Sequence, residues 1–212
     1  MTDACRINAV TRMHSSRSRG TLPPPSRMAL VFVFAFSSAA AADGLSDAHA
    51  VIRAAEGGSR GGRAAATYIV EQLQKLEARP GGDGGGWYQP FGSRRNILAL
   101  LPGSDPEMGG EIVVVGAHYD HVGYGTEGNS YGPFGLVHNG ADDNASGVAG
   151  LLEVAEAVGR LAPRPRRTIL VAFWDGEEQG LLGSRHFLRV RPDPVADAKI
   201  VFSVNLDMIG RL

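Results

Sequence analysis

The stretch GADDNASG, residues 140–147, places two adjacent carboxylates, Asp142 and Asp143, directly before a segment with helical spacing. In that segment, residues 148–158, apolar side chains recur every three or four positions, as on one face of an amphipathic helix. The next apolar run, TILVAFW at 168–174, is apolar at nearly every position, which is typical of a strand covered on both faces. A helix followed by a buried strand predicts an α/β layered fold.

The flanking segments continue this alternation in both directions. The predicted helices cover residues 64–77, 148–158 and 181–189, and the predicted strands cover 96–101, 112–115, 168–174 and 200–206, with a short edge segment at 87–91. Because residues 102–110 form a polar turn between two apolar runs, we expect the strands 96–101 and 112–115 to pair as a hairpin. Residues 123–140 form a long glycine-rich loop.

Side chains of the types that bind metals gather where the apolar runs end. They are, in chain order, His118, Asp120, Glu177, Glu178 and Asp207. The ligand crevice of an open α/β sheet lies at the carboxyl ends of its strands, so segments far apart in the sequence converge there. The sequence therefore predicts one site that is built from all of these side chains together with the carboxylates of residues 140–147.

The available donors indicate a cation held by imidazole and carboxylate groups. The single cysteine is Cys5, so a disulfide framework and zinc–thiolate sites are excluded. An unpaired carboxylate entering a core is costly, which favours a cation beside Asp207. The candidate metal ligands are His118, Asp142, Glu178 and Asp207.

Each candidate also has an ordinary structural explanation. Asp142 alone is a typical helix N-cap, whose carboxylate accepts hydrogen bonds from unpaired backbone N–H groups. The pair Glu177 and Glu178 alone is typical of an exposed turn. His121 and His138 are interpreted as loop residues.

The N-terminal region has the pattern of an exported protein. Five arginines precede the nine apolar residues 28–36, and small residues follow up to Ala42. That order is typical of a secretory signal peptide over residues 1–42, and the apolar run is shorter than the about 20 residues that span a bilayer. The 21 basic and 22 acidic residues are nearly balanced and form no basic stripe, which argues against nucleic-acid binding.

These motifs together resemble the zinc-dependent exopeptidase family that includes secreted bacterial leucine aminopeptidases, aminopeptidase Y, glutamate carboxypeptidase II and the glutaminyl cyclases. The matching segments are RN at 95–96, VVVGAHYDH at 113–121, NGADDNASG at 139–147, the segment 173–184 and the segment 204–210. The resemblance covers about residues 64–212 and leaves 43–63 as an N-terminal segment. It implies a three-layer α/β/α fold with a mixed, mostly parallel sheet, the zinc exopeptidase fold.

The resemblance also implies a role for each site residue. His118 and Asp207 would hold one zinc ion, Glu178 the other, and Asp142 would bridge the two. Asp120 would orient the ring of His118, and Glu177 would be the general base. A cis peptide bond is expected between Asp142 and Asp143. The family has a fifth ligand, a histidine, well beyond the position of Asp207, and this chain ends at Leu212. The resemblance thus implies a missing C-terminal part, a second zinc site without its histidine, and weak or no activity.

Four functions remain open on these grounds. The first is a secreted or periplasmic aminopeptidase with two zinc ions that removes N-terminal residues from peptides or proteins. The second is a glutaminyl cyclase, which is a transferase with one zinc ion, and the third is a carboxypeptidase of the same fold. The fourth is a non-catalytic fragment. The oligomeric state is left open.

Overall fold

The computed structural model describes residues 60–76 and 78–211, so the predicted signal peptide 1–42 and most of the segment 43–63 lie outside the described residues. The elements are α2 (Arg60–Lys75), β1 (Arg79–Pro80), β2 (Tyr88–Phe91), β3 (Arg94–Leu101), β4 (Glu111–His118), α3 (Gly147–Gly159), β5 (Thr168–Trp174), α4 (Leu182–Arg189) and β6 (Lys199–Asn205). A kinked segment of irregular helix, η3 (Ala141–Ser146), leads directly into α3. The predicted helices and strands are all present.

The strands form one mixed sheet in the order β1-β3-β5-β4-β6, with β2 paired to β3 beside this path. The expected hairpin between β3 and β4 is wrong, because β5 lies between them, antiparallel to β3 and parallel to β4. A turn after β3 does not require pairing with the next strand when a later strand fills the gap. Among the described residues, the expected parallel arrangement holds for β5, β4 and β6, whereas β1, β2 and β3 pair antiparallel.

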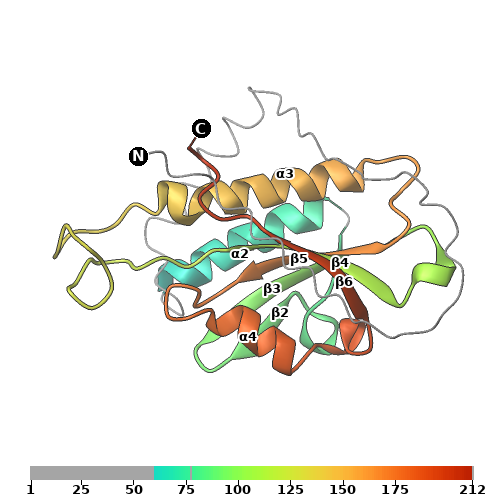
Figure 1. Cartoon of the computed structure of the whole chain (residues 1–212), viewed down its shortest axis with the longest axis horizontal. Helices are drawn as coiled ribbons and strands as arrows, with labels where there is room; N and C mark the ends of the chain where they lie inside the picture. Colours follow the sequence, from blue (N-terminus) through green and yellow to red (C-terminus); the bar gives the residue numbers. More distant parts are fainter. Residues whose placement is uncertain (1–59, 77, 212) are drawn as a thin grey trace, which may run out of the picture.

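Helices cover both faces of the sheet, which confirms the three-layer prediction. In Figure 1, α2 and α3 lie together over one face and α4 lies over the other. The side chains of β3 divide accordingly, since Ile97 and Ala99 pack in the core with α2 and α3 whereas Leu98 packs in the core that contains Phe187 of α4. This alternation is the two-residue period of a strand buried on both faces.

A buried pair of amides fixes α4 to the antiparallel part of the sheet. Gln89 and Asn96 are both 0% exposed, and the Asn96 side chain donates from Nδ2 to Gln89 Oε1 and to the carbonyl of Gly183, at 2.9 Å in each case. The backbone N–H of Asp175 donates to Asn96 Oδ1 at 3.2 Å. These contacts hold both ends of the turn between β5 and α4, which carries Glu177 and Glu178.

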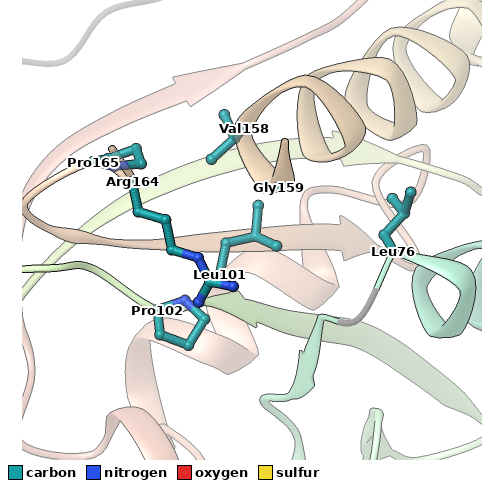
Figure 2. A pocket seen from close by; sticks show the side chains of 7 residues that line it. All are labelled: Leu76, Leu101, Pro102, Val158, Gly159, Arg164 and Pro165. Atoms are coloured by element: carbon teal, nitrogen blue, oxygen red, sulfur yellow. The ribbon is translucent and has the colours of Figure 1, made fainter. Parts of the chain in front are cut away.

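The parallel strands place the ligand-type side chains at one edge of the sheet. His118 is the last residue of β4, its register partner Trp174 is the last of β5, and α3 begins at the same edge. The pocket in Figure 2 lies at the opposite end, where Leu101 of β3 meets Val158 near the end of α3. It contains none of the ligand-type residues. Within the described residues, no helix is both long and apolar enough to cross a membrane.

Candidate metal centre

His118 is the centre of the carboxylate cluster. The side chain is 1% exposed, and Nδ1 contacts the backbone carbonyl of Asp120 at 3.1 Å. The opposite nitrogen, Nε2, lies 3.1 Å from Asp143 Oδ1 and 3.5 Å from Asp207 Oδ1. Two donors bound to zinc at about 2.0 Å in tetrahedral geometry stand about 3.3 Å apart, so both distances from His118 Nε2 are close to the spacing that a zinc ion requires.

The structure places Asp143, not Asp142, beside His118. Asp142 Oδ1 instead accepts a hydrogen bond from the N–H of Gly210 at 2.9 Å, and Oδ2 lies 3.1 Å from Nε of Arg211. The reason is local, because the backbone leaves helical geometry at Asp143 and Asn144 and turns the Asp143 side chain toward the strand ends. The expected position of the cis peptide bond is wrong by one residue, since the cis bond joins Asp143 to Asn144.

A second group of donors shares Asp143 with the first. One ligand atom each from His121, Asp143 and Glu178 lie within 4.8 Å of one another, as do those of His118, Asp143 and Asp207. His121, interpreted from the sequence as a loop residue, contacts Glu178 Oε1 through Nδ1 at 2.7 Å. The sequence feature that could have indicated this contact is a second histidine three residues after His118, just past the end of a strand.

Asp120 joins the segment after β4 to the turn after β5. Its carboxylate accepts hydrogen bonds from the backbone N–H groups of Glu177 and Glu178, at 3.0 Å and 3.4 Å. The carboxylate lies 3.7 Å from His118 Nδ1, which is too long for a hydrogen bond, so the carbonyl of Asp120 is the closer partner of the ring. Glu177 Oε2 lies 4.0 Å from His118 Nε2, within the same cluster.

The cluster around His118 gathers several carboxylates about a single imidazole. Burial acts to lower the pKa of His118, but the carboxylates of Asp120, Asp143 and Asp207 outweigh burial and raise that pKa to about 12. Burial raises the pKa of Glu177, and the neighbouring carboxylates raise it further, while His118 lowers it. These carboxylates strongly favour a positive charge beside them, because they raise the pKa of the imidazole. They are therefore a suitable donor set for a divalent cation.

Asn144 ties the three segments of the site together. The Asn144 side chain is 1% exposed. Its Nδ2 donates to the carbonyl of Leu206 at 2.9 Å and to that of His118 at 3.4 Å. Its Oδ1 accepts from the N–H of Gly147 at 3.0 Å and from the N–H of Met208 at 3.1 Å. One side chain thereby links the ends of β4 and β6 to the start of α3.

The loop 122–139 leaves the site after His121 and returns to it at Gly140. A Cβ at Gly140, which has φ of 60°, would lie 3.0 Å from Cδ2 of His121, so the two ends of the loop are in contact. Backbone hydrogen bonds pair its two arms, from Gly125 N–H to the carbonyl of Leu136 and from His138 N–H to that of Gly123. We call this paired segment the ribbon loop, and in Figure 1 it projects beyond the sheet.

Residues 96–212 match the model of peptidase family M28. The chain belongs to peptidase family M28. Leucine aminopeptidase 1 of Grosmannia clavigera is 33% identical over 163 residues, which is 72% of this chain and 36% of that protein. Leupeptin-inactivating enzyme 1 of Streptomyces exfoliatus is 35% identical over 115 residues, 54% of this chain and 22% of the relative. The chain thus spans between about a fifth and two fifths of the length of these curated relatives.

Solved structures agree with the M28 assignment at the level of the fold. A glutaminyl cyclase from Porphyromonas gingivalis superposes with a TM-score of 0.63 at 24% identity, covering 82% of this chain and 62% of the other. A Zn-dependent exopeptidase from Parabacteroides distasonis has a TM-score of 0.61 at 24% identity, covering 80% and 61%. The α/β zinc exopeptidase fold is therefore the fold of this chain.

Proposed function

We propose that this chain is a metal-dependent aminopeptidase domain with two metal positions. The observation that carries the proposal is the central carboxylate of Asp143, which belongs to both donor groups of the site. A carboxylate between two sets of donors is the arrangement that a pair of cations needs, whereas a single cation would use one set. Peptidase activity fits the names of the relatives, which include leucine aminopeptidases and an enzyme that inactivates leupeptin.

The residues present fit zinc in type and spacing. His118, Asp143 and Asp207 would hold the first ion, and Asp143 and Glu178 would contribute to the second. Asp143 therefore takes the bridging role that the sequence pattern suggested for Asp142. When bound, the ions would polarise the scissile carbonyl and lower the pKa of a water molecule, so that hydroxide is available near neutral pH.

Glu177 would be the general base. Its carboxylate stands at the edge of the first donor group, and Asp120 holds its backbone in place through the N–H group. Burial and the nearby carboxylates raise the pKa of Glu177. The shift is in the direction that general base catalysis requires, because a base works best when its pKa lies near the working pH. The side chain is 26% exposed, so a substrate and water can reach it.

The expected substrates are the N-termini of peptides or proteins, outside the cell or in the periplasm. Export rests on the basic, apolar and small-residue order of residues 1–42. A glutaminyl cyclase is the competing reading, supported by the shared fold, but the family resemblance gives that class one zinc ion. The number of metal ions therefore separates the two readings.

Adjacent substitutions test the proposal. We expect the purified chain to bind two zinc ions and to hydrolyse leucine amide only weakly, as the family resemblance implies for a chain without the fifth ligand. Asp143→Asn should lose both ions, whereas the control Asp142→Asn, which removes a carboxylate one residue away, should keep them. Zinc per chain is measured by mass spectrometry after dialysis, and a wild-type chain that binds no zinc would refute the proposal. Cyclisation of an N-terminal glutamine peptide without leucine amide hydrolysis would replace it by the cyclase.

A further inference from the structure

We propose that the ribbon loop is the surface on which a peptide substrate lies beyond the bond to be cleaved, and that it selects peptides with apolar side chains at their fourth and fifth residues. This inference rests on the proposed aminopeptidase function and names the class of substrate that this function would take. The loop takes no part in metal binding and supplies contact area for the peptide instead.

The ribbon loop is held together by hydrogen bonds of its own. The Asn129 side chain donates to the carbonyl of Tyr124 at 3.0 Å. Nε2 of His138 contacts the carbonyl of Pro133 at 3.1 Å, and a Cβ at Gly125 would lie 2.4 Å from the same nitrogen, so the two arms are closely packed there. The loop is therefore a built structure that presents a defined outer surface.

The outer surface of the ribbon loop is apolar. Leu136 is 58% exposed and Phe134 is 53% exposed, although proteins usually bury both kinds of side chain. The large apolar side chains that the loop exposes are Tyr124, Tyr131, Phe134, Leu136 and Val137. Apolar side chains that gather in this way mark a surface that binds another molecule.

The apolar side chains lie at a distance from the donor cluster that a short peptide can reach. Val137 and Leu136 stand three and four residues before Gly140, the end of the loop that is in contact with the His121 ring. Antiparallel arms rise about 3.3 Å per residue, so these two residues are about 10 to 13 Å from the cluster along the loop. An extended peptide has the same rise, and with its first residue at the cluster its fourth and fifth residues reach the same distance.

The charge distribution fits a peptide in this orientation. Between residues 122 and 139 the only Asp, Glu, Lys or Arg is Glu127. The donor cluster gathers carboxylates that carry one more charge than two divalent cations balance, and they belong to Asp120, Asp143, Glu177, Glu178 and Asp207. A peptide has its ammonium group at one end, so the cluster attracts that end and leaves the uncharged remainder for the loop.

Peptide binding to the zinc-loaded 212-residue chain tests the inference, with fluorescence anisotropy as the measurement. The probes are dye-labelled hexapeptides that begin with leucine, carry an N-methylated first peptide bond against cleavage, and differ only in phenylalanine or serine at the fourth and fifth residues. We expect the phenylalanine peptide to bind about tenfold more tightly. Leu136→Ser combined with Val137→Ser should remove most of this preference. The matched control, Leu188→Ser combined with Val190→Ser, changes exposed residues at the end of α4 away from Glu177 and should keep it.

The outcomes separate the inference from the proposed function. Equal binding of the two peptides, or an unchanged preference in the Leu136→Ser and Val137→Ser variant, would overturn the role of the ribbon loop and leave the proposed function standing. Acetylation of the peptide amino group should weaken binding, and an acetylated peptide that binds equally well would also overturn the inference, because the loop would then hold peptides independently of the cluster.

Two further measurements complete the test. Light scattering that shows a dimer in the wild type and a monomer in the Leu136→Ser and Val137→Ser variant would assign the apolar surface to a second copy of the chain and overturn the inference. A wild-type chain that binds no zinc refutes the proposed function and the inference with it. Equal zinc content and thermal unfolding of variant and wild type show that the variant folds, and the wild-type preference between the two peptides decides the question without any variant.

Discussion

Replacing Asn144 by alanine should destabilise the metal-free chain more than any other single polar substitution near the site. The side chain makes four hydrogen bonds and is 1% exposed, so truncation leaves their partners without a replacement in a buried place. Because those partners belong to three segments, the loss would loosen the ends of β4 and β6 and the start of α3 together.

The magnitude follows from the individual distances. Three of the hydrogen bonds, to Leu206, Gly147 and Met208, lie between 2.9 and 3.1 Å, and the bond to His118 is weaker at 3.4 Å. At about 1 kcal/mol of net stability for each of the three, and more where a buried partner stays unpaired, the free energy of unfolding should fall by about 3 to 4 kcal/mol. For a domain of this size the melting temperature should fall by about 10 °C.

Urea and thermal unfolding in the presence of a chelator measure the effect without a contribution from metal binding. The matched control is Asn139→Ala, the same substitution at an exposed position five residues earlier, which should change stability by less than about 0.5 kcal/mol. If Asn144→Ala and Asn139→Ala unfold at the same urea concentration, the reasoning that Asn144 joins the three segments is wrong.

Three further predictions concern the base, a buried acid and the second core. Glu177→Gln should lower turnover about 10²–10⁴-fold while the zinc content stays unchanged. A loss of zinc that parallels the loss of turnover would contradict the role of Glu177 as the general base. Burial raises the pKa of Asp175 above 3.8, so its charged form opposes folding. As pH rises from about 4 to 7, the free energy of unfolding of Asp175→Asn should therefore increase relative to that of the wild type. A difference between the two unfolding free energies that stays the same across this pH range would contradict the prediction. Phe187→Ala should cost about 3 to 5 kcal/mol, measured by urea unfolding, and a change below 1 kcal/mol would show that Phe187 does not anchor α4.

Periodicity predicted most of the secondary structure because the apolar spacing is strong. The strand at 168–174 was predicted at its observed bounds, since a strand buried on both faces has a nearly continuous apolar run. Strand order was not predictable in the same way. The hairpin interpretation of residues 102–110 used only local turn chemistry, whereas the insertion of β5 between β3 and β4 depends on pairing with a strand more than 50 residues later.

The location of the site was predictable from the sequence, but its detailed geometry was not. His118 and Asp207 meet at one edge because parallel strands end there. The choice between Asp142 and Asp143 depends on backbone angles within η3 that two adjacent aspartates do not reveal. The contact between His121 and Glu178 was not predicted, because a histidine in a loop has no periodic context and the two segments meet only where Asp120 joins them.

The ribbon loop has a consequence for how such a chain can diversify. Its two ends are in contact at His121 and Gly140, and its arms pair with each other, so residues added at the tip, near 127–131, would leave both anchor points where they are. Insertions there are therefore expected to leave the donor cluster unaltered. The tip is thus a natural place for grafting a foreign recognition peptide, and a place where homologous lineages are free to lengthen the chain.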